Sequence, residues 1–202
     1  MSVRFSREGF VGQFSLVASI AGGLAAAVYL VNSLTRPDAV VPVMLSAFGS
    51  GFDRSAPTAP FQGARDSAGE YQFSQLPVDA RPWARAGLIV ALILLAALFF
   101  AIHRQARKTG GGRLWILAPG APAGWIAATL VALGFLPQVA QWFGVRTLAG
   151  LAADPGVILP VPLALDLGWI VAGIGYYALV RSVRARGIAP EPAPAVEVGR
   201  VA

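Results

Sequence analysis

Asp166 is the only acidic residue inside a long apolar segment of this chain, and it is the first residue whose type and position could do chemistry. An ionisable side chain inside a membrane is costly, so by default it indicates a function. Gln138 and Gln141, in the preceding apolar segment, are expected at a similar depth. The three side chains form a candidate intramembrane polar site. They could line a polar path, or the amides could hydrogen-bond to Asp166 and fix the helix register.

Other reactive groups are scarce. The chain has no cysteine and a single histidine, His103. This composition excludes disulfides, thiolate chemistry and any metal site built on two or more histidines. A Ser-His-Asp arrangement would have to use His103, and neither serine nor an acid lies near it in the sequence. We therefore expect no catalytic or metal-binding residue and no cofactor.

The composition places these residues in a membrane protein. Of 202 residues, 56% are apolar and 13% charged, whereas soluble domains are about 25% charged. The mean hydropathy is +0.64. The net charge of +6 does not indicate nucleic acid, because the basic residues flank apolar segments instead of forming a soluble basic face.

Four continuous apolar segments predict transmembrane helices over residues 11–34, 86–104, 120–143 and 157–181. A helix needs roughly 20 apolar residues to cross about 30 Å of hydrocarbon. The segments lack the alternation of barrel strands, and helices satisfy their own backbone groups in lipid. The predicted fold class is therefore an all-α membrane domain of four helices over residues 1–187.

The first segment has a signal peptide as its alternative. Arg4 and Arg7 precede it, and Ala25 to Ala27 could form a cleavage site. Apolar sequence continues through residues 28–31, which is too long for a typical signal peptide and favours a retained helix.

Two regions are expected outside the bilayer. The loop 35–85 contains β-favouring stretches at residues 40–45 and 71–74, which predict short strands in a small cap that packs on the helices. The proline-rich residues 188–202 have no apolar period and predict a disordered tail.

The distribution of Lys and Arg predicts the orientation. Ten cations lie in the N-terminal segment, the loop after the second helix and the C-terminal segment, against six in the other two loops. We therefore expect a multi-pass protein of the bacterial inner membrane with both termini in the cytoplasm.

Small residues predict helix packing, because they let helix backbones approach closely. Helix one has a row of them at spacing four, and helix four has a shorter pair; the positions are Ser15, Ser19, Gly23, Ala27, Gly168 and Ala172. Packing within one chain and packing between chains both remain open.

The order of these parts resembles a bacterial family of uncharacterised four-span membrane proteins, a domain of unknown function. The residues that carry the resemblance are Gly124-Trp125-Ile126 at the start of the third helix and residues 179–184 at the end of the fourth. Residues 109–112, Thr-Gly-Gly-Gly, stand where that family commonly has a Gly-x-Pro-Phe-like step. The resemblance implies a sensing or regulatory role and supplies no catalytic residues.

The sequence thus predicts a non-enzymatic sensory, regulatory or partner-binding membrane component. The alternative is a small transporter or channel subunit that uses Asp166 in a polar path. An enzyme using Asp166 or His103 ranks last. The expected partners are the lipid bilayer and either another protein or a second copy of the chain.

Overall fold

Four long helices form the body of the molecule in the computed structural model, which describes residues 7–44, 61–65, 68–73, 76–109, 115–149, 163 and 165–187. The long helices are α1 (Arg7–Thr35), α2 (Ala86–Thr109), α3 (Ala121–Ala149) and α4 (Leu167–Ala185). Two short 3₁₀ helices, η1 (Arg81–Arg85) and η2 (Trp115–Leu117), precede α2 and α3. The predicted tail 188–202 lies outside the described residues.

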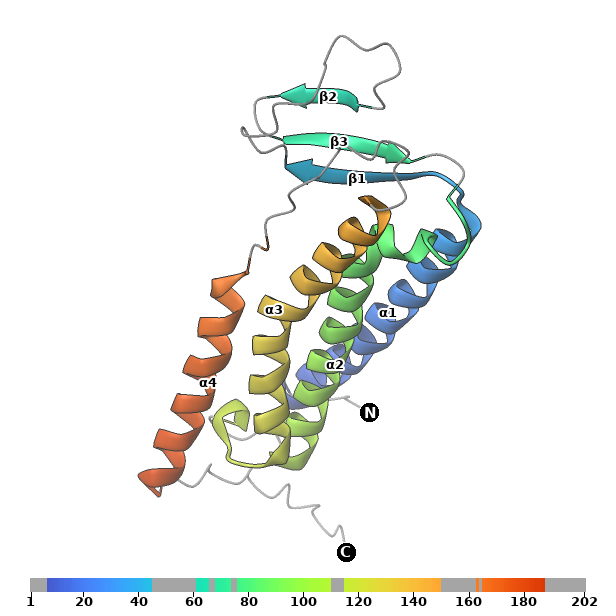
Figure 1. Ribbon diagram of the computed structural model, residues 1–202. Helices are drawn as coiled ribbons and strands as arrows, with labels where there is room; N and C mark the ends of the chain where they lie inside the picture. Colours follow the sequence, from blue (N-terminus) through green and yellow to red (C-terminus); the bar gives the residue numbers. More distant parts are fainter. Residues whose placement is uncertain are drawn as a thin grey trace, which may run out of the picture.

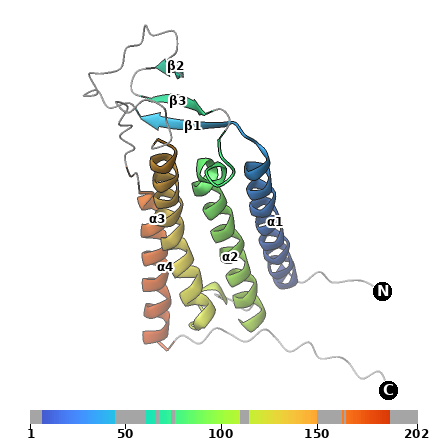
Figure 2. The ribbon, with the colours of Figure 1, turned by 45° about the vertical axis from the view of Figure 1, so that its right-hand side comes forward.

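The helices pack in chain order. Each has its extensive contacts with its sequence neighbour: α1 with α2, α2 with α3, and α3 with α4. Consecutive helices run antiparallel and lie in the order α1, α2, α3, α4 in both views (Figures 1 and 2). They form an open layer instead of a closed bundle, so α1 and α4 are edge helices.

Among the described residues, three helical segments are long and apolar enough to cross a membrane, and α4 is not one of them. They are residues Phe10–Thr35, Arg81–Thr109 and Ala121–Leu148. In the most apolar stretch of the first, only 11% of the residues are buried, against 39% in the third. The layer thus exposes apolar side chains laterally, as a protein in lipid does.

The seam between α1 and α2 follows alternating steps of three and four residues. On α1, Gly12, Ser15, Gly22 and Ala26 face α2, with Ser15 and Ala26 buried. Between them Ser19 Oγ donates a 2.8 Å hydrogen bond to the Ala96 carbonyl of α2. Steps of three and four keep contact residues on one side of a helix and are typical of left-handed packing.

The predicted row at spacing four is therefore only half right. Ser15 and Ser19 lie in the seam, but Gly23 and Ala27 are exposed, and a Cβ on Gly23 would meet no atom within 4 Å. The reason is geometric: four residues advance about 400° around a helix, about 40° more than one turn. Two further steps carry the row off the contact side.

The predicted pair on α4 is displaced in the same way. Gly168 and Ala172 are exposed, whereas Gly173, like Val180 further along the helix, is buried. A Cβ at Gly173 would lie 2.7 Å from Val131 Cγ2 and 2.8 Å from the Ala127 carbonyl oxygen. α4 therefore approaches α3 through Gly173, and the backbones lie too close there for any side chain.

A core cluster lies between α2 and α3. It consists of Leu98, Ala101, Ile126 and Leu133. α3 also contains Pro137, which lacks the backbone N–H of a regular turn and bends helices; Figure 1 shows α3 bent.

A small antiparallel sheet covers the end of the layer where α1 and α3 finish (Figure 1). Its strands are β1 (Ala39–Met44), β2 (Phe61–Arg65) and β3 (Ala68–Phe73), in the order β1-β3-β2. Ala39 pairs with Phe73 and Met44 with Ala68. β1 is an edge strand, where the missing N–H of its proline can be tolerated. We call this the sheet end of the molecule.

Side-chain and backbone contacts fasten the sheet end to the helices. Arg81 donates from Nε to the Leu76 carbonyl and from a terminal nitrogen to the Leu34 carbonyl, both at 2.8 Å. Leu34 lies in the last turn of α1, where carbonyls lack helical partners. The Leu76 N–H donates to the Pro37 carbonyl at 2.9 Å. Arg81 thus closes the end of α1 and holds the returning chain beside it.

The largest departure from the predicted helix bounds is in α4. The prediction began this helix at residue 157, but the helix begins at Leu167, and Leu163, Leu165 and Asp166 are not helical. Asp166 is the N-cap residue. The apolar pattern did not mark the start of this helix, because apolar residues lie on both sides of Asp166.

The α3–α4 contact gives a direct prediction. Gly173→Val should destabilise the protein by about 1–3 kcal/mol, the usual cost of forcing extra atoms into a packed contact. Gly175→Val is the matched control, because a Cβ there meets nothing within 4 Å. Unfolding in detergent micelles, followed by tryptophan fluorescence, measures both. Equal stability of the two variants would contradict the α3–α4 packing.

Candidate functional site

Asp166 caps a helix and does not lie within one. Its carboxylate accepts a 3.1 Å hydrogen bond from the Gly168 N–H, and the side chain is exposed. Its own N–H donates to the Gly134 carbonyl of α3 at 3.0 Å. A carboxylate at a helix N-terminus satisfies an unpaired N–H and meets the positive end of the helix dipole. The prediction of an acid inside an apolar helix was therefore wrong.

The two glutamines do not bond to Asp166. Gln141 Oε1 accepts from the Gly87 N–H of α2 at 3.2 Å, and Gln138 is only partly buried. Gly87 is the second residue of α2 and lies against α3, where a Cβ would be 2.8 Å from Gln141 Cβ. Gln141 therefore fixes the α2–α3 register, while the predicted cluster of three polar side chains is not assembled.

His103 has a structural contact. Its Nδ1 lies 2.8 Å from the Gly12 carbonyl oxygen of α1. A carbonyl oxygen only accepts, so Nδ1 carries the proton in this bond. Among the residues that the structure describes, no group of three His, Cys, Asp or Glu side chains could hold a metal ion. His103 therefore joins α2 to α1 at the end opposite the sheet.

The same end is held by two hydrogen bonds to the chain around η2. Gln105, 1% exposed, donates from Nε2 to the Ala118 carbonyl at 2.7 Å. The Tyr176 hydroxyl of α4 donates to the Ile116 carbonyl at 2.6 Å. Side chains from α2 and α4 thus fix the turn that leads into α3.

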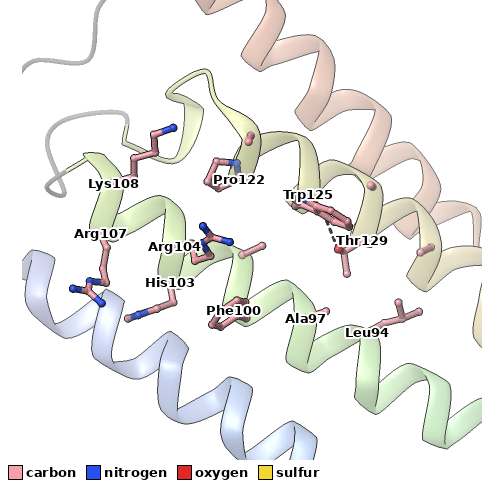
Figure 3. A pocket seen from close by; sticks show the side chains of 14 residues that line it. Leu94, Ala97, Phe100, His103, Arg104, Arg107, Lys108, Pro122, Trp125 and Thr129 are labelled. Carbon is pink, nitrogen blue, oxygen red and sulfur yellow. Dashed lines mark hydrogen bonds between the residues drawn. The ribbon is translucent and has the colours of Figure 1, made fainter.

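A groove between α2 and α3 is the concave feature that this turn borders. Its volume is about 1030 Å³. One wall comes from α2, with Leu94, Ala97 and Phe100, and the other from α3, with Trp125 and Thr129 (Figure 3). The groove is apolar along its length, and its lining becomes basic where α2 ends.

Three cations line the basic end of the groove: Arg104, Arg107 and Lys108. All three are exposed. The acids whose side chains the structure describes, Asp38, Asp79 and Asp166, belong to the sheet end. The groove thus changes from apolar to cationic along the direction of the helices.

Cations at the sheet end have a different environment. Besides Arg81, which donates to carbonyls, Arg85 lies 6.0 Å from the ring centre of Tyr29, and Arg146 lies 5.2 Å from that of Trp142. These distances are in the range of cation–π contacts. Arg81, Arg85 and Arg146 therefore have contacts that stabilise the fold, whereas the cations at the groove are exposed.

Comparison of the chain with protein families, with curated proteins and with solved structures gave no match.

The groove was not predicted from the sequence, although part of its pattern is present there. Pro122, Trp125 and Thr129 recur at steps of three and four, and Arg107 and Lys108 follow Arg104 by three and four residues. Such steps place residues on one side of a helix. Which sides of α2 and α3 meet depends on packing, so the groove itself could not be located.

The capping role of Asp166 is testable. Asp166→Ala should lower stability by about 1 kcal/mol, the usual cost of removing a helix N-cap, and Asp166→Asn should retain most of it because asparagine caps equally well. Denaturant titration in micelles measures both variants. An asparagine variant as unstable as the alanine variant would show that the charge itself is required.

Proposed function

We propose that this chain is a four-span protein of the bacterial inner membrane, with both termini in the cytoplasm, that acts by binding a protein partner or a second copy through α1. The proposal places the sheet on the exported side and the groove on the cytoplasmic side. It makes the protein a sensory or regulatory component without catalytic activity, in keeping with the family that the sequence resembles.

The orientation is supported by the charges at the two ends. Arg104, Arg107 and Lys108 of α2 lie at the end opposite the sheet, together with Arg181 and Arg184 of α4. An excess of Lys and Arg beside the membrane favours the cytoplasmic side. With 19 residues, α4 is about 28 Å long at 1.5 Å per residue, close to the thickness of the hydrocarbon.

The single observation that carries partner binding is the position of α1 at the edge of an open layer. Its extensive helix contact is with α2 alone. Large apolar side chains are exposed on the side of α1 away from α2: Phe10, Phe14, Val17, Ile20, Leu24, Val28 and Val31. Lipid can cover such a face, so apolar exposure alone does not define a binding surface.

Small residues on the uncovered side of α1 supply the second argument. Gly23 and Ala27 are exposed there, and space is open around Gly23. Glycine and alanine one turn apart allow a second helix to approach closely, which is how helices associate where hydrophobic burial gives no driving force. The half of the row that the α1–α2 seam leaves unused is therefore available to another helix.

Transport is the competing hypothesis, and it relied on an acid within the bilayer. Asp166 lies at the exposed start of α4 and caps that helix. The observation that favoured transport therefore no longer supports it, and partner binding is the function that we propose.

Photo-crosslinking in native membranes tests this proposal. A photoreactive residue at Ala27 should give a discrete protein adduct, and the same residue at Leu179, on the exposed side of α4, should give none. Gly23→Leu should reduce the adduct at least tenfold, since the side chain blocks close approach.

The matched control is Gly175→Leu, which adds the same side chain in open space on the other edge helix. It should leave the adduct unchanged. An Ala27→Cys disulfide in this cysteine-free chain then distinguishes a second copy from another protein. Diffuse lipid adducts alone at position 27, or an adduct that Gly23→Leu does not affect, would refute the proposal.

A further inference from the structure

The groove between α2 and α3 combines two environments that an amphiphile requires. Along most of its length it is lined by apolar side chains, including Leu94, Phe100 and Trp125. Trp125 is 68% exposed and Phe100 is 47% exposed, so both rings lie open toward the groove and the lipid. A volume of about 1030 Å³ is at the upper end of the roughly 300–1,000 Å³ typical of small-molecule sites.

Among the acidic side chains that the structure describes, none lies at the basic end of the groove. None of the described acidic side chains forms an ion pair with Arg104, Arg107 or Lys108, and the acids that are described lie at the sheet end. Lys108 Nζ reaches toward the turn before α3, 3.7 Å from the position that a Cβ on Gly120 would take. Figure 3 shows the cations gathered at one end and the apolar side chains following them along α2 and α3.

We propose that this groove binds one anionic phospholipid of the bilayer. The phosphate lies against Arg104 and Lys108, and an acyl chain follows the apolar walls past Trp125 toward Leu94. The inference rests on the proposed orientation, which brings the basic end to the cytoplasmic headgroup layer.

Charge complementarity selects this occupant. A zwitterionic lipid would fill the apolar length equally well but leave the cations without a net counter-charge. Basic pockets between transmembrane helices on the cytoplasmic side are typical sites for anionic headgroups. The ordering also matches: the cations follow the apolar residues toward the end of α2, as a headgroup follows its acyl chain.

Native mass spectrometry of the full-length protein in detergent tests the site. Delipidated protein is titrated with phosphatidylglycerol and with phosphatidylcholine carrying the same acyl chains. One phosphatidylglycerol should bind with at least tenfold preference. Near a membrane surface one Lys or Arg contributes about fivefold in affinity. Arg104→Gln with Lys108→Gln should therefore weaken phosphatidylglycerol binding about thirtyfold.

The matched control removes the same charge at the same end but outside the groove. Arg181→Gln with Arg184→Gln, on α4, should change the affinity less than twofold. If both pairs weaken binding equally, the effect is one of general surface charge and the site is refuted. Equal binding of the two lipids would refute it too.

A second variant tests the apolar part. Ala128 is exposed and lines the groove, so Ala128→Phe fills it while every charge is kept. It should abolish the bound phosphatidylglycerol, and unchanged helix content by circular dichroism and unchanged thermal unfolding should show that the fold is intact. Lipid retained by this variant, or displaced equally by inorganic phosphate, would show that the groove holds no acyl chain.

The orientation is tested separately, so the two failures are distinguishable. A cysteine at Ser182 should react with an impermeant maleimide only after the cells are permeabilised, whereas one at Ser67 should react in intact cells. The reverse pattern would refute the proposed orientation, while the titration in micelles would still report on the groove.

Discussion

Close approach of helix backbones at small residues is the contact on which the arrangement of this molecule depends. Gly22 of α1 lies against Ala96, Gly87 of α2 against Gln141, and Gly173 of α4 against Val131. In lipid, apolar surface drives association weakly, and packing and hydrogen bonds hold helices together. Each of these contacts joins a helix to its sequence neighbour. The result is an open layer, and both the exposed edge at α1 and the groove between α2 and α3 follow from it.

Polar side chains within the helix layer form their hydrogen bonds inside the protein and so do not need water. In the described part of the chain, no buried side-chain nitrogen or oxygen lacks a hydrogen-bond partner. Ser15, Thr129 and Ser182 donate to carbonyls one turn earlier in their own helices, and Ser19 donates across to α2. The described charged side chains lie at the two ends of the layer. At the sheet end, Arg81 and Asp166 bond to the backbone, whereas the cations at the groove are exposed, so the two ends have different roles.

The positions of three helices could be predicted because the apolar length that a membrane requires is a local property of the sequence. The start of α4 could not be found in this way, since apolar residues lie on both sides of Asp166; its capping ability was the better signal. The row at spacing four correctly placed Ser15 and Ser19 in the α1–α2 seam but wrongly included Gly23. The residues of α1 that contact α2 are 3.5 residues apart on average, so a row at spacing four leaves the contact side. The groove and the bond between Gln141 and Gly87 depend on how two helices are placed, which no pattern within either helix contains.

The order of helices in the layer is the central claim, and cysteine pairs in the cysteine-free chain test it most directly. Paired cysteines at Ser19 and Ala96, and at Gly12 and Ala106, should form intramolecular disulfides rapidly under mild oxidation in membranes, since a Cβ on Gly12 would lie 3.9 Å from the Ala106 Cβ. A pair at Gly23 and Gly175, on the two edge helices, should form no intramolecular disulfide. Rapid intramolecular cross-linking of that last pair would mean that α1 and α4 close into a bundle, and would contradict the open layer.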